Sequence, residues 1–99
     1  MYYIEKTTEF DKWLRKLKDL RAKAKILFRI QKIIIDEHFG NCEPVGQGIR
    51  ELKIDYGKGY RVYFKQMDGK IIILLMGGDK STQQQDIEKA KIILKRITN

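Results

Sequence analysis

The sequence predicts an α+β fold: a small antiparallel β-sheet with an N-terminal helical hairpin and a C-terminal helix. Two patterns support this prediction. Apolar residues recur at helical spacing in residues 8–37 and 82–97, whereas residues 49–67 alternate between apolar and polar. The expected element order is β-α-α-β-β-β-α. With 99 residues and no linker or repeat, we expect a single domain over residues 1–99.

The N-terminal elements are predicted as one strand and two helices. Residues 2–5 have the pattern of a short strand, and Thr7 or Thr8 can cap the helix that follows. That helix has one apolar stripe, formed by Phe10, Trp13, Leu14, Leu17 and Leu20. A second helix is expected over about residues 21–37, with Leu27, Ile30 and Ile34 facing inward.

A hairpin is predicted from residues 49–56 and 60–67, joined by the three-residue loop Gly57-Lys58-Gly59. In this register Ile54 lies opposite Val62 and Asp55 opposite Arg61. The apolar face of the hairpin is expected to consist of Leu52, Ile54, Tyr60, Val62 and Phe64.

The C-terminal part is predicted as a central strand followed by a helix. Residues 70–76 form a continuous apolar run, which is typical of a strand covered on both faces. Gly77-Gly78 interrupts the run, and Ser81 or Thr82 can cap the last helix. Its inward stripe is expected to contain Ile87, Ala90, Leu94 and Ile97.

The charge balance indicates an anionic partner. Lysine and arginine number 21 and aspartate and glutamate 13, so the formal net charge is +8. Such a field favours nucleic acid or an acidic protein, although surplus lysine can also serve solubility alone. One cysteine and no run of roughly 20 apolar residues lead us to expect a cytoplasmic protein without a membrane partner.

The polar face of the hairpin is the candidate functional site. This face is expected to gather Glu51, Lys53, Asp55, Arg61, Tyr63 and Lys65, with Lys80 nearby. One interpretation is an ordinary solvated face with paired charges. The other is an open cationic platform, on which Lys65 and Lys58 hold phosphates and Tyr63 stacks on a base.

Other site chemistries find little support in the sequence. With only His38 and Cys42 as candidate ligands, we expect no metal site, and no phosphate-binding glycine loop is present, so no cofactor is expected. An open platform could still cleave RNA, because the 2′-hydroxyl supplies the nucleophile. Glu51 or Lys53 would then act as the base and Arg61 would bind the phosphate. Lys80 or Tyr63 would complete the proton path.

Two segments carry a family resemblance: GQGIRELKIDYGKGYRVYF (46–64) and GGDKSTQQQDIEKA (77–90). They resemble the RelE/ParE superfamily of toxins from type II toxin–antitoxin systems, and within it the addiction-module killer, or HigB-like, proteins. The resemblance implies a metal-independent endonuclease that cuts mRNA in the ribosomal decoding site. It places Glu51, Lys53, Arg61 and Lys80 at the positions of the family's site residues. The tyrosine or histidine that many relatives carry near the C-terminus has no equivalent in ILKRITN.

The resemblance leaves two alternatives to a nuclease. A ParE-like protein would inhibit DNA gyrase by binding it, and a non-catalytic basic module would bind only its antitoxin. In each case the resemblance implies an antitoxin partner, which we expect to be small and acidic because this chain is basic.

Overall fold

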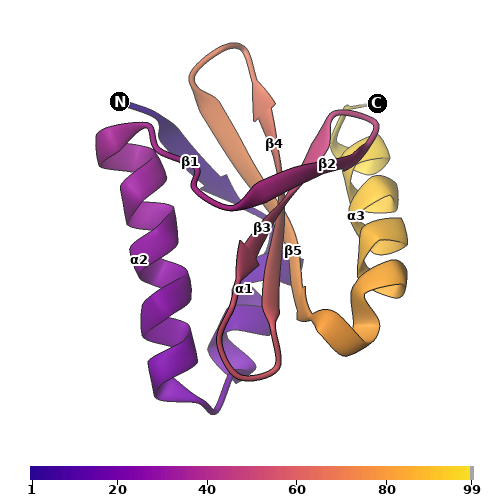
Figure 1. Ribbon diagram of the computed structural model, residues 1–99. Coiled ribbons are helices and arrows are strands. Elements are labelled where there is room, and N and C mark those ends of the chain that lie inside the picture. Colours follow the sequence, from indigo (N-terminus) through magenta and orange to yellow (C-terminus); the bar gives the residue numbers. More distant parts are fainter. Residues whose placement is uncertain (99) are drawn as a thin grey trace.

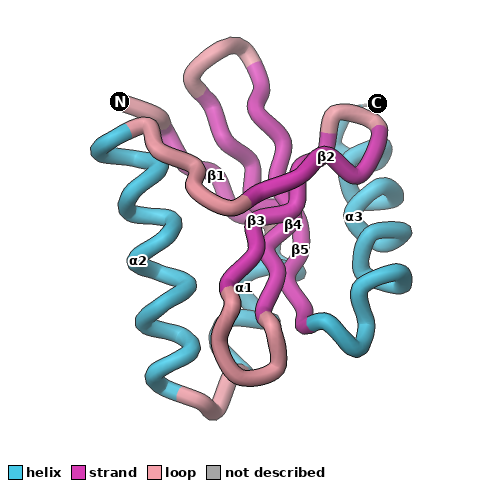
Figure 2. The backbone as a smooth tube through the Cα atoms, in the orientation of Figure 1, coloured by secondary structure: helices cyan, strands magenta, loops and turns pink. Residues whose placement is uncertain are grey.

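The structure, a computed structural model, describes residues 1–98. In this part of the chain, five strands form one sheet in the order β1-β5-β4-β3-β2 (Figures 1 and 2). The strands are β1 (Tyr3–Lys6), β2 (Cys42–Gly46), β3 (Ile49–Ile54), β4 (Tyr60–Met67) and β5 (Ile71–Asp79). The helices are α1 (Thr8–Lys16), α2 (Leu20–Asp36) and α3 (Gln83–Thr98), and the 3-10 turn η1 (Lys80–Thr82) precedes α3. The predicted α+β class is confirmed.

The sheet differs from the prediction in two respects. It is mixed, because β1 pairs in parallel with β5 while the other neighbours are antiparallel. It also contains β2, an edge strand that pairs with β3 and that the sequence analysis did not identify. Pro44 obscures this strand in the sequence, since proline lacks an N–H group and is tolerated in a sheet mainly at its edge.

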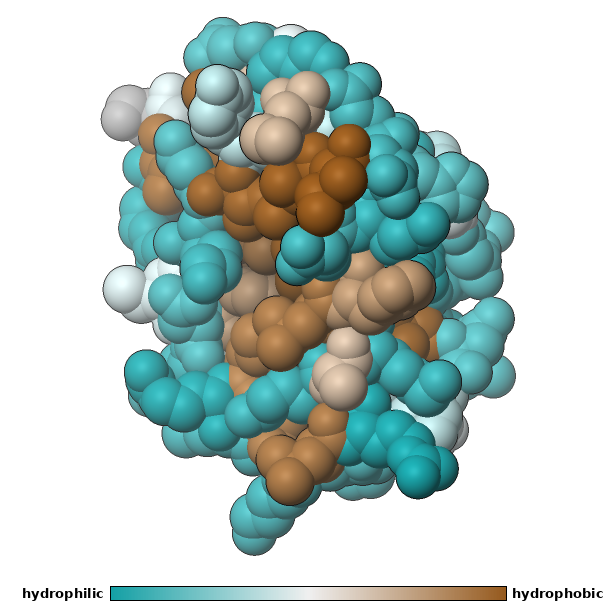
Figure 3. Space-filling model, turned by 90° about the vertical axis from the view of Figure 1, so that its left-hand side faces the viewer, coloured by the Kyte–Doolittle hydropathy of each residue, from teal (hydrophilic) through white to brown (hydrophobic). Residues whose placement is uncertain are grey.

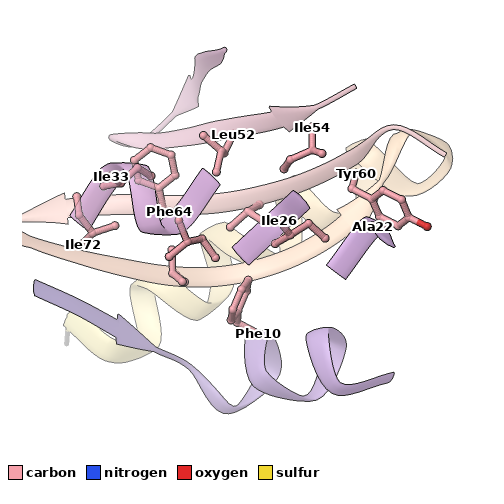
Figure 4. Close-up of a cluster of buried hydrophobic side chains, with 12 residues drawn as sticks. Phe10, Ala22, Ile26, Ile33, Leu52, Ile54, Tyr60, Phe64 and Ile72 are labelled. Carbon is pink, nitrogen blue, oxygen red and sulfur yellow. The ribbon is translucent and has the colours of Figure 1, made fainter. Parts of the chain in front are cut away.

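The helices cover both faces of the sheet, α1 and α2 on one and α3 on the other (Figure 1). Below α1 and α2, side chains from helices and strands form the larger core, which includes Phe10, Ile26, Ile33, Leu52 and Phe64 (Figure 4). Below α3 lies a smaller core built on Tyr63, Leu75, Ala90 and Leu94. Among residues 1–98, no helix combines the length and apolar character that a membrane span requires.

The side of α2 that faces the core is rotated from the predicted one: Ile30 is buried and Ile34 packs against the core as expected, but Leu27 is not inward. The buried residues are Ala22, Ile26, Ile30 and Ile33. Leu27, which the sequence analysis placed inward, is instead 47% exposed. The helix has apolar residues on more than one side, so its periodicity alone could not distinguish the buried side from the exposed one.

The β3–β4 pairing is offset by two residues from the predicted register. Lys53 pairs with Arg61 and Ile54 with Tyr60, so β3 ends at Ile54 and the loop spans residues 55–59. Backbone bonds from Gly59 to Tyr56 (3.0 Å) and from Tyr56 to Ile54 (2.9 Å) close this longer loop. The predicted opposition of Asp55 to Arg61 was therefore wrong. A two-residue shift keeps every side chain on its face, so the predicted apolar face is correct.

Candidate functional site

Three cationic residues lie in adjacent segments, where the β3–β4 loop adjoins the start of η1. The Lys80 backbone N–H donates to the Lys58 carbonyl (3.3 Å), so the backbones of these two exposed residues lie side by side. A Cβ placed on Gly59 would lie 3.3 Å from Lys80 Cβ and 3.5 Å from Arg61 Nη1, so this glycine leaves room for both side chains. We call Lys58, Lys80 and Arg61 the cationic end of the sheet.

A surface cavity of about 460 Å³ adjoins the cationic end. Its lining includes Lys58 and two further lysines, Lys16 and Lys18, from the end of α1 and the turn that follows. Trp13 and Tyr60 also contribute to the lining, as do the acidic residues Asp19 and Asp79. Lys16 and Lys18 were not among the predicted site residues. The available signal was only that they lie off the apolar stripe of α1, as most surface lysines do.

Arg61 continues from the cationic end into a buried polar cluster beneath α3. Its Nε lies 3.8 Å from Glu51 Oε1, and its Nη1 donates to the Tyr60 carbonyl (3.2 Å). Glu51 also accepts a hydrogen bond from Gln83 Nε2 of α3 (2.7 Å). Glu51 is 1% and Arg61 7% exposed. A buried ion pair stabilises a fold only when additional hydrogen bonds satisfy its polar atoms, and Gln83 supplies one such bond to Glu51.

The expectation of an open platform was therefore wrong. The apolar stripe of α3 must be buried, and α3 packs on the face that carries Glu51, Arg61 and Tyr63. Tyr63 is fully buried and cannot stack on a base in this structure. Burial, followed by the neighbouring charge of Glu51, raises the pKa of Tyr63, so its hydroxyl stays protonated.

Two other predicted site residues have their ammonium groups on polar partners at the other end of β3 and β4, although Lys53 is the cross-strand partner of Arg61. Lys53 lies on β3, where its Nζ is 3.0 Å from Glu43 Oε2 of the edge strand β2. Lys65 lies further along β4, where its Nζ donates to the Gln47 carbonyl (3.3 Å) in the β2–β3 turn. The structure thus brings together Lys58, Lys80 and Arg61, and it separates Lys65 from them.

The fold is shared with toxins of the RelE type. A chain of the E. coli RelBE toxin–antitoxin complex matches with a TM-score of 0.67 at 16% identity, covering 80% of this chain and 96% of that one. A chain of the RelBE2 complex of Mycobacterium tuberculosis gives 0.61 at 18%, covering 80% and 98%. A doubly substituted E. coli RelE toxin in the free state gives 0.64 at 14%, covering 89% and 96%. The predicted RelE-like architecture is confirmed.

The chain belongs to the family described as phage-derived protein Gp49-like, which matches residues 12–98. An uncharacterised protein of Haemophilus influenzae is 52% identical over 94 residues, which are 95% of this chain and 94% of that protein. Together with the shared fold, the family match confirms the resemblance to the RelE/ParE superfamily of toxins.

Proposed function

We propose that this protein is the toxin of a type II toxin–antitoxin system and acts as a ribosome-dependent mRNA endonuclease. The observation that carries the proposal is that Lys58, Lys80 and Arg61 lie in adjacent segments at one end of a RelE-type sheet. Lysine and arginine bind the phosphate oxygens of a nucleic acid, which suits this end to a sugar–phosphate chain. The net charge of +8 adds a long-range attraction toward RNA.

The proposed cleavage uses the RNA's own 2′-hydroxyl and no cofactor. The 2′-oxygen attacks the adjacent phosphorus and the bond to the 5′-oxygen breaks, which leaves a 2′,3′-cyclic phosphate and a 5′-hydroxyl. A base accepts the proton of the 2′-hydroxyl, and an acid donates one to the leaving oxygen. Lys80 and the end of the Arg61 guanidinium would stabilise the extra negative charge on the phosphorus group. Lys58, as the neutral amine, would accept the proton of the 2′-hydroxyl, and Lys80, as the ammonium, would donate a proton to the leaving 5′-oxygen.

The buried cluster then has a supporting role. Glu51 and Tyr63 are out of reach of an RNA at the surface. Glu51 lies beside Arg61 Nε and is held by Gln83, so we assign it as a positioning residue for the guanidinium. Lys53, paired with Glu43, is not needed for this scheme.

Exposed lysines provide the test of the proposed function. Replacing Arg61 by alanine would leave the buried Glu51 charge unpaired, a change that costs about 3–5 kcal/mol and confounds activity with folding. Lys80→Ala avoids this, and Lys95→Ala, an exposed lysine near the end of α3, is its control. Programmed ribosomes are incubated with each protein and the mRNA ends are mapped. We expect cuts with the unsubstituted chain and with Lys95→Ala, and loss of cuts with Lys80→Ala.

A second candidate function is supported by the burial of Glu51 and Tyr63. A toxin that inhibits DNA gyrase by binding it, as ParE-like proteins do, needs no exposed acid or base. A supercoiling assay run beside the ribosome assay separates the two functions. Loss of supercoiling with intact mRNA would favour the gyrase inhibitor.

The proposal includes a partner and a compartment. Because the chain carries a net charge of +8, we propose an acidic antitoxin as its inhibitor. We propose that the toxin acts in the cytoplasm, where its ribosomal target is located.

A further inference from the structure

The cavity beside the cationic end contains a polar atom that the fold leaves unused. The ring of Tyr60 packs in the larger core, and the residue is 5% exposed. Its hydroxyl points away from the other labelled side chains of this core (Figure 4). The hydroxyl makes no hydrogen bond within residues 1–98, yet it is not one of their buried atoms without a partner. It therefore opens into the cavity that Tyr60 lines, where it can donate a hydrogen bond to a ligand and accept one.

Two carboxylates lie near this hydroxyl. Burial raises the pKa of Tyr60, and the negative charges of Asp19 and Asp79 raise it further. Both aspartates line the cavity, and Asp79 is also the cross-strand partner of Tyr60. The hydrogen bonds that Asp79 accepts from Ser81 use its Oδ1 and lower the pKa of this carboxyl, which stays ionised. Lone pairs on its Oδ2 are therefore acceptors for a ligand.

The outer part of the cavity has a positive balance of charge. It lies between the β3–β4 loop and the turn from α1 to α2, at the lower end of the molecule in Figure 1, and Figure 3 shows mainly hydrophilic side chains at this end. The exposed charged residues of the lining are Lys16, Lys18, Lys58 and Asp19. Tyr60 is buried and Asp79 half-buried, so hydrogen-bond acceptors lie deeper than the lysines.

This arrangement selects the kind of ligand. A matching ligand carries negative charge toward the lysines and hydrogen-bond donors toward Asp79, and a nucleotide within an RNA has both. A volume of about 460 Å³ is typical of small-molecule sites and can hold one nucleoside. A free phosphate ion would instead bring its charge against the carboxylates.

We propose that this cavity binds a guanine base of the RNA, and that Asp79 and Tyr60 recognise the edge of that base. The inference deepens the proposed function and rests on it for RNA as the substrate. Guanine is the base with two neighbouring donors, N1–H and the 2-amino group, and both point toward a carboxylate placed on that edge. Its O6 lies next to them and accepts a hydrogen bond from the Tyr60 hydroxyl. Uracil instead has one N–H between two oxygens, which a carboxylate repels.

The place of the cavity beside the cationic end fits this assignment. Lys58 belongs to both, and Lys80 directly follows Asp79 in the chain. A guanosine seated in the cavity therefore has its phosphates near Lys58 and Lys80, where cleavage is proposed. Trp13 adds an aromatic surface to the lining, on which the face of a base can pack. We expect this guanosine to adjoin the bond that is cut.

Short RNAs that cannot be cut provide defined probes. Three pentanucleotides have uridine at the four outer positions and guanosine, inosine or uridine at the centre, and 2′-O-methyl groups block the nucleophile throughout. Trp13 is the single tryptophan of the sequence and lines the cavity, so quenching of its fluorescence reports binding to the full chain. We expect the guanosine probe to bind at least tenfold more tightly than the uridine probe. Inosine lacks the 2-amino group and should also bind at least tenfold more weakly than guanosine.

Substitutions in the chain locate the recognition of guanine. Asp79→Asn keeps a side chain that can cap η1 but puts an amide N–H group in place of Oδ2, so it should remove the preference for guanosine over inosine. Tyr60→Phe should weaken binding of the guanosine probe at least threefold. Asp68→Asn is the control, because it makes the same change of charge in the exposed β4–β5 turn, at the opposite end of the sheet (Figure 1).

The Tm of each variant is the folding control, and Tyr60→Phe decides alone if Asp79→Asn does not fold. Equal affinity for the three probes would overturn the proposal. So would an equal loss of binding with Asp79→Asn and Asp68→Asn, or a Tyr60→Phe variant that binds guanosine normally.

Cut sites on ribosome-bound mRNA separate this inference from the proposed function. We expect cuts next to guanosines with the unsubstituted chain and with Asp68→Asn, and loss of this preference with Asp79→Asn. Cuts without any preference for guanosine would overturn the inference and leave the proposed function standing. Binding that selects guanosine, without any cuts on the ribosome, would refute the nuclease and support the cavity as a guanine site.

Discussion

Replacing Tyr63 by phenylalanine tests whether this tyrosine is a structural or a chemical residue. Its hydroxyl is one of two buried side-chain polar atoms without a hydrogen-bond partner in residues 1–98, the other being Arg61 Nε. A buried polar group without a partner costs about 1–3 kcal/mol of stability. Tyr63→Phe removes this cost and keeps the ring in the core beneath α3. We therefore expect the free energy of unfolding to rise by about 1 kcal/mol.

For a domain of this size, about 1 kcal/mol corresponds to a rise in Tm of roughly 4–8 °C. Urea unfolding followed by circular dichroism measures the change. Tyr60→Phe is the matched control, because its hydroxyl is not among the buried atoms without a partner, and its stability should change little. Tyr63→Ala should lose about 3–5 kcal/mol by opening a cavity.

Activity gives the second readout of Tyr63→Phe. The variant should inhibit translation as well as the unsubstituted chain, since the side chain is 0% exposed. A fall of more than about 1 kcal/mol in the free energy of unfolding would refute the reasoning, because it would show that the hydroxyl makes a stabilising hydrogen bond. A loss of activity with unchanged stability would restore Tyr63 as a participant in proton transfer.

Two further predictions concern stability. Gly77→Ala places a Cβ closer than 3.0 Å to the Trp13 ring and should cost about 2–3 kcal/mol. Gly69→Ala meets no atom within 4 Å, but its φ of +77° strains an alanine, so this variant should lose only about 1 kcal/mol; urea unfolding of both variants checks the difference. The hydrogen bond from Arg96 lowers the pKa of Glu9 from 4.5 to about 2, so the stabilisation is complete above pH 4.5 and is lost as the pH falls toward 2. Glu9→Gln should therefore lower Tm at pH 7 but not at pH 2, and an equal effect at both would contradict the ion pair.

The sequence was sufficient to predict the helices and strands in which apolar residues recur at a regular spacing. The alternation in β3 and β4 predicted which side chains share a face, and Thr7 does cap α1, accepting a bond from the Phe10 N–H (3.0 Å). The register was wrong because two loop lengths, three and five residues, preserve the same alternation. Asp79, rather than Ser81 or Thr82, supplies the capping side chain seen at this end: it caps η1, the 3-10 turn before α3, by accepting a bond from the Ser81 N–H (2.8 Å).

The candidate site was predicted only in part. Lys58, Arg61 and Lys80 were named from the sequence, and the structure places them in adjacent segments. The burial of Tyr63 could not be predicted from the strand pattern. An alternation of apolar and polar residues is compatible with a solvated face and also with a face covered by a helix. The apolar stripe of α3 must be buried against a face of the sheet. This requirement could have indicated that the polar face of the hairpin is covered.

The most direct test of the central claim is the single-turnover rate of mRNA cleavage in the ribosomal decoding site. It is measured for the unsubstituted chain, for a Lys58→Gln/Lys80→Gln double variant and for Lys95→Gln, each with its Tm as a folding control. The account predicts that the double variant loses cleavage at least a hundredfold while keeping its Tm, and that Lys95→Gln cuts normally. Cleavage by the double variant at the normal rate would contradict the assignment of the cationic end as the RNA site.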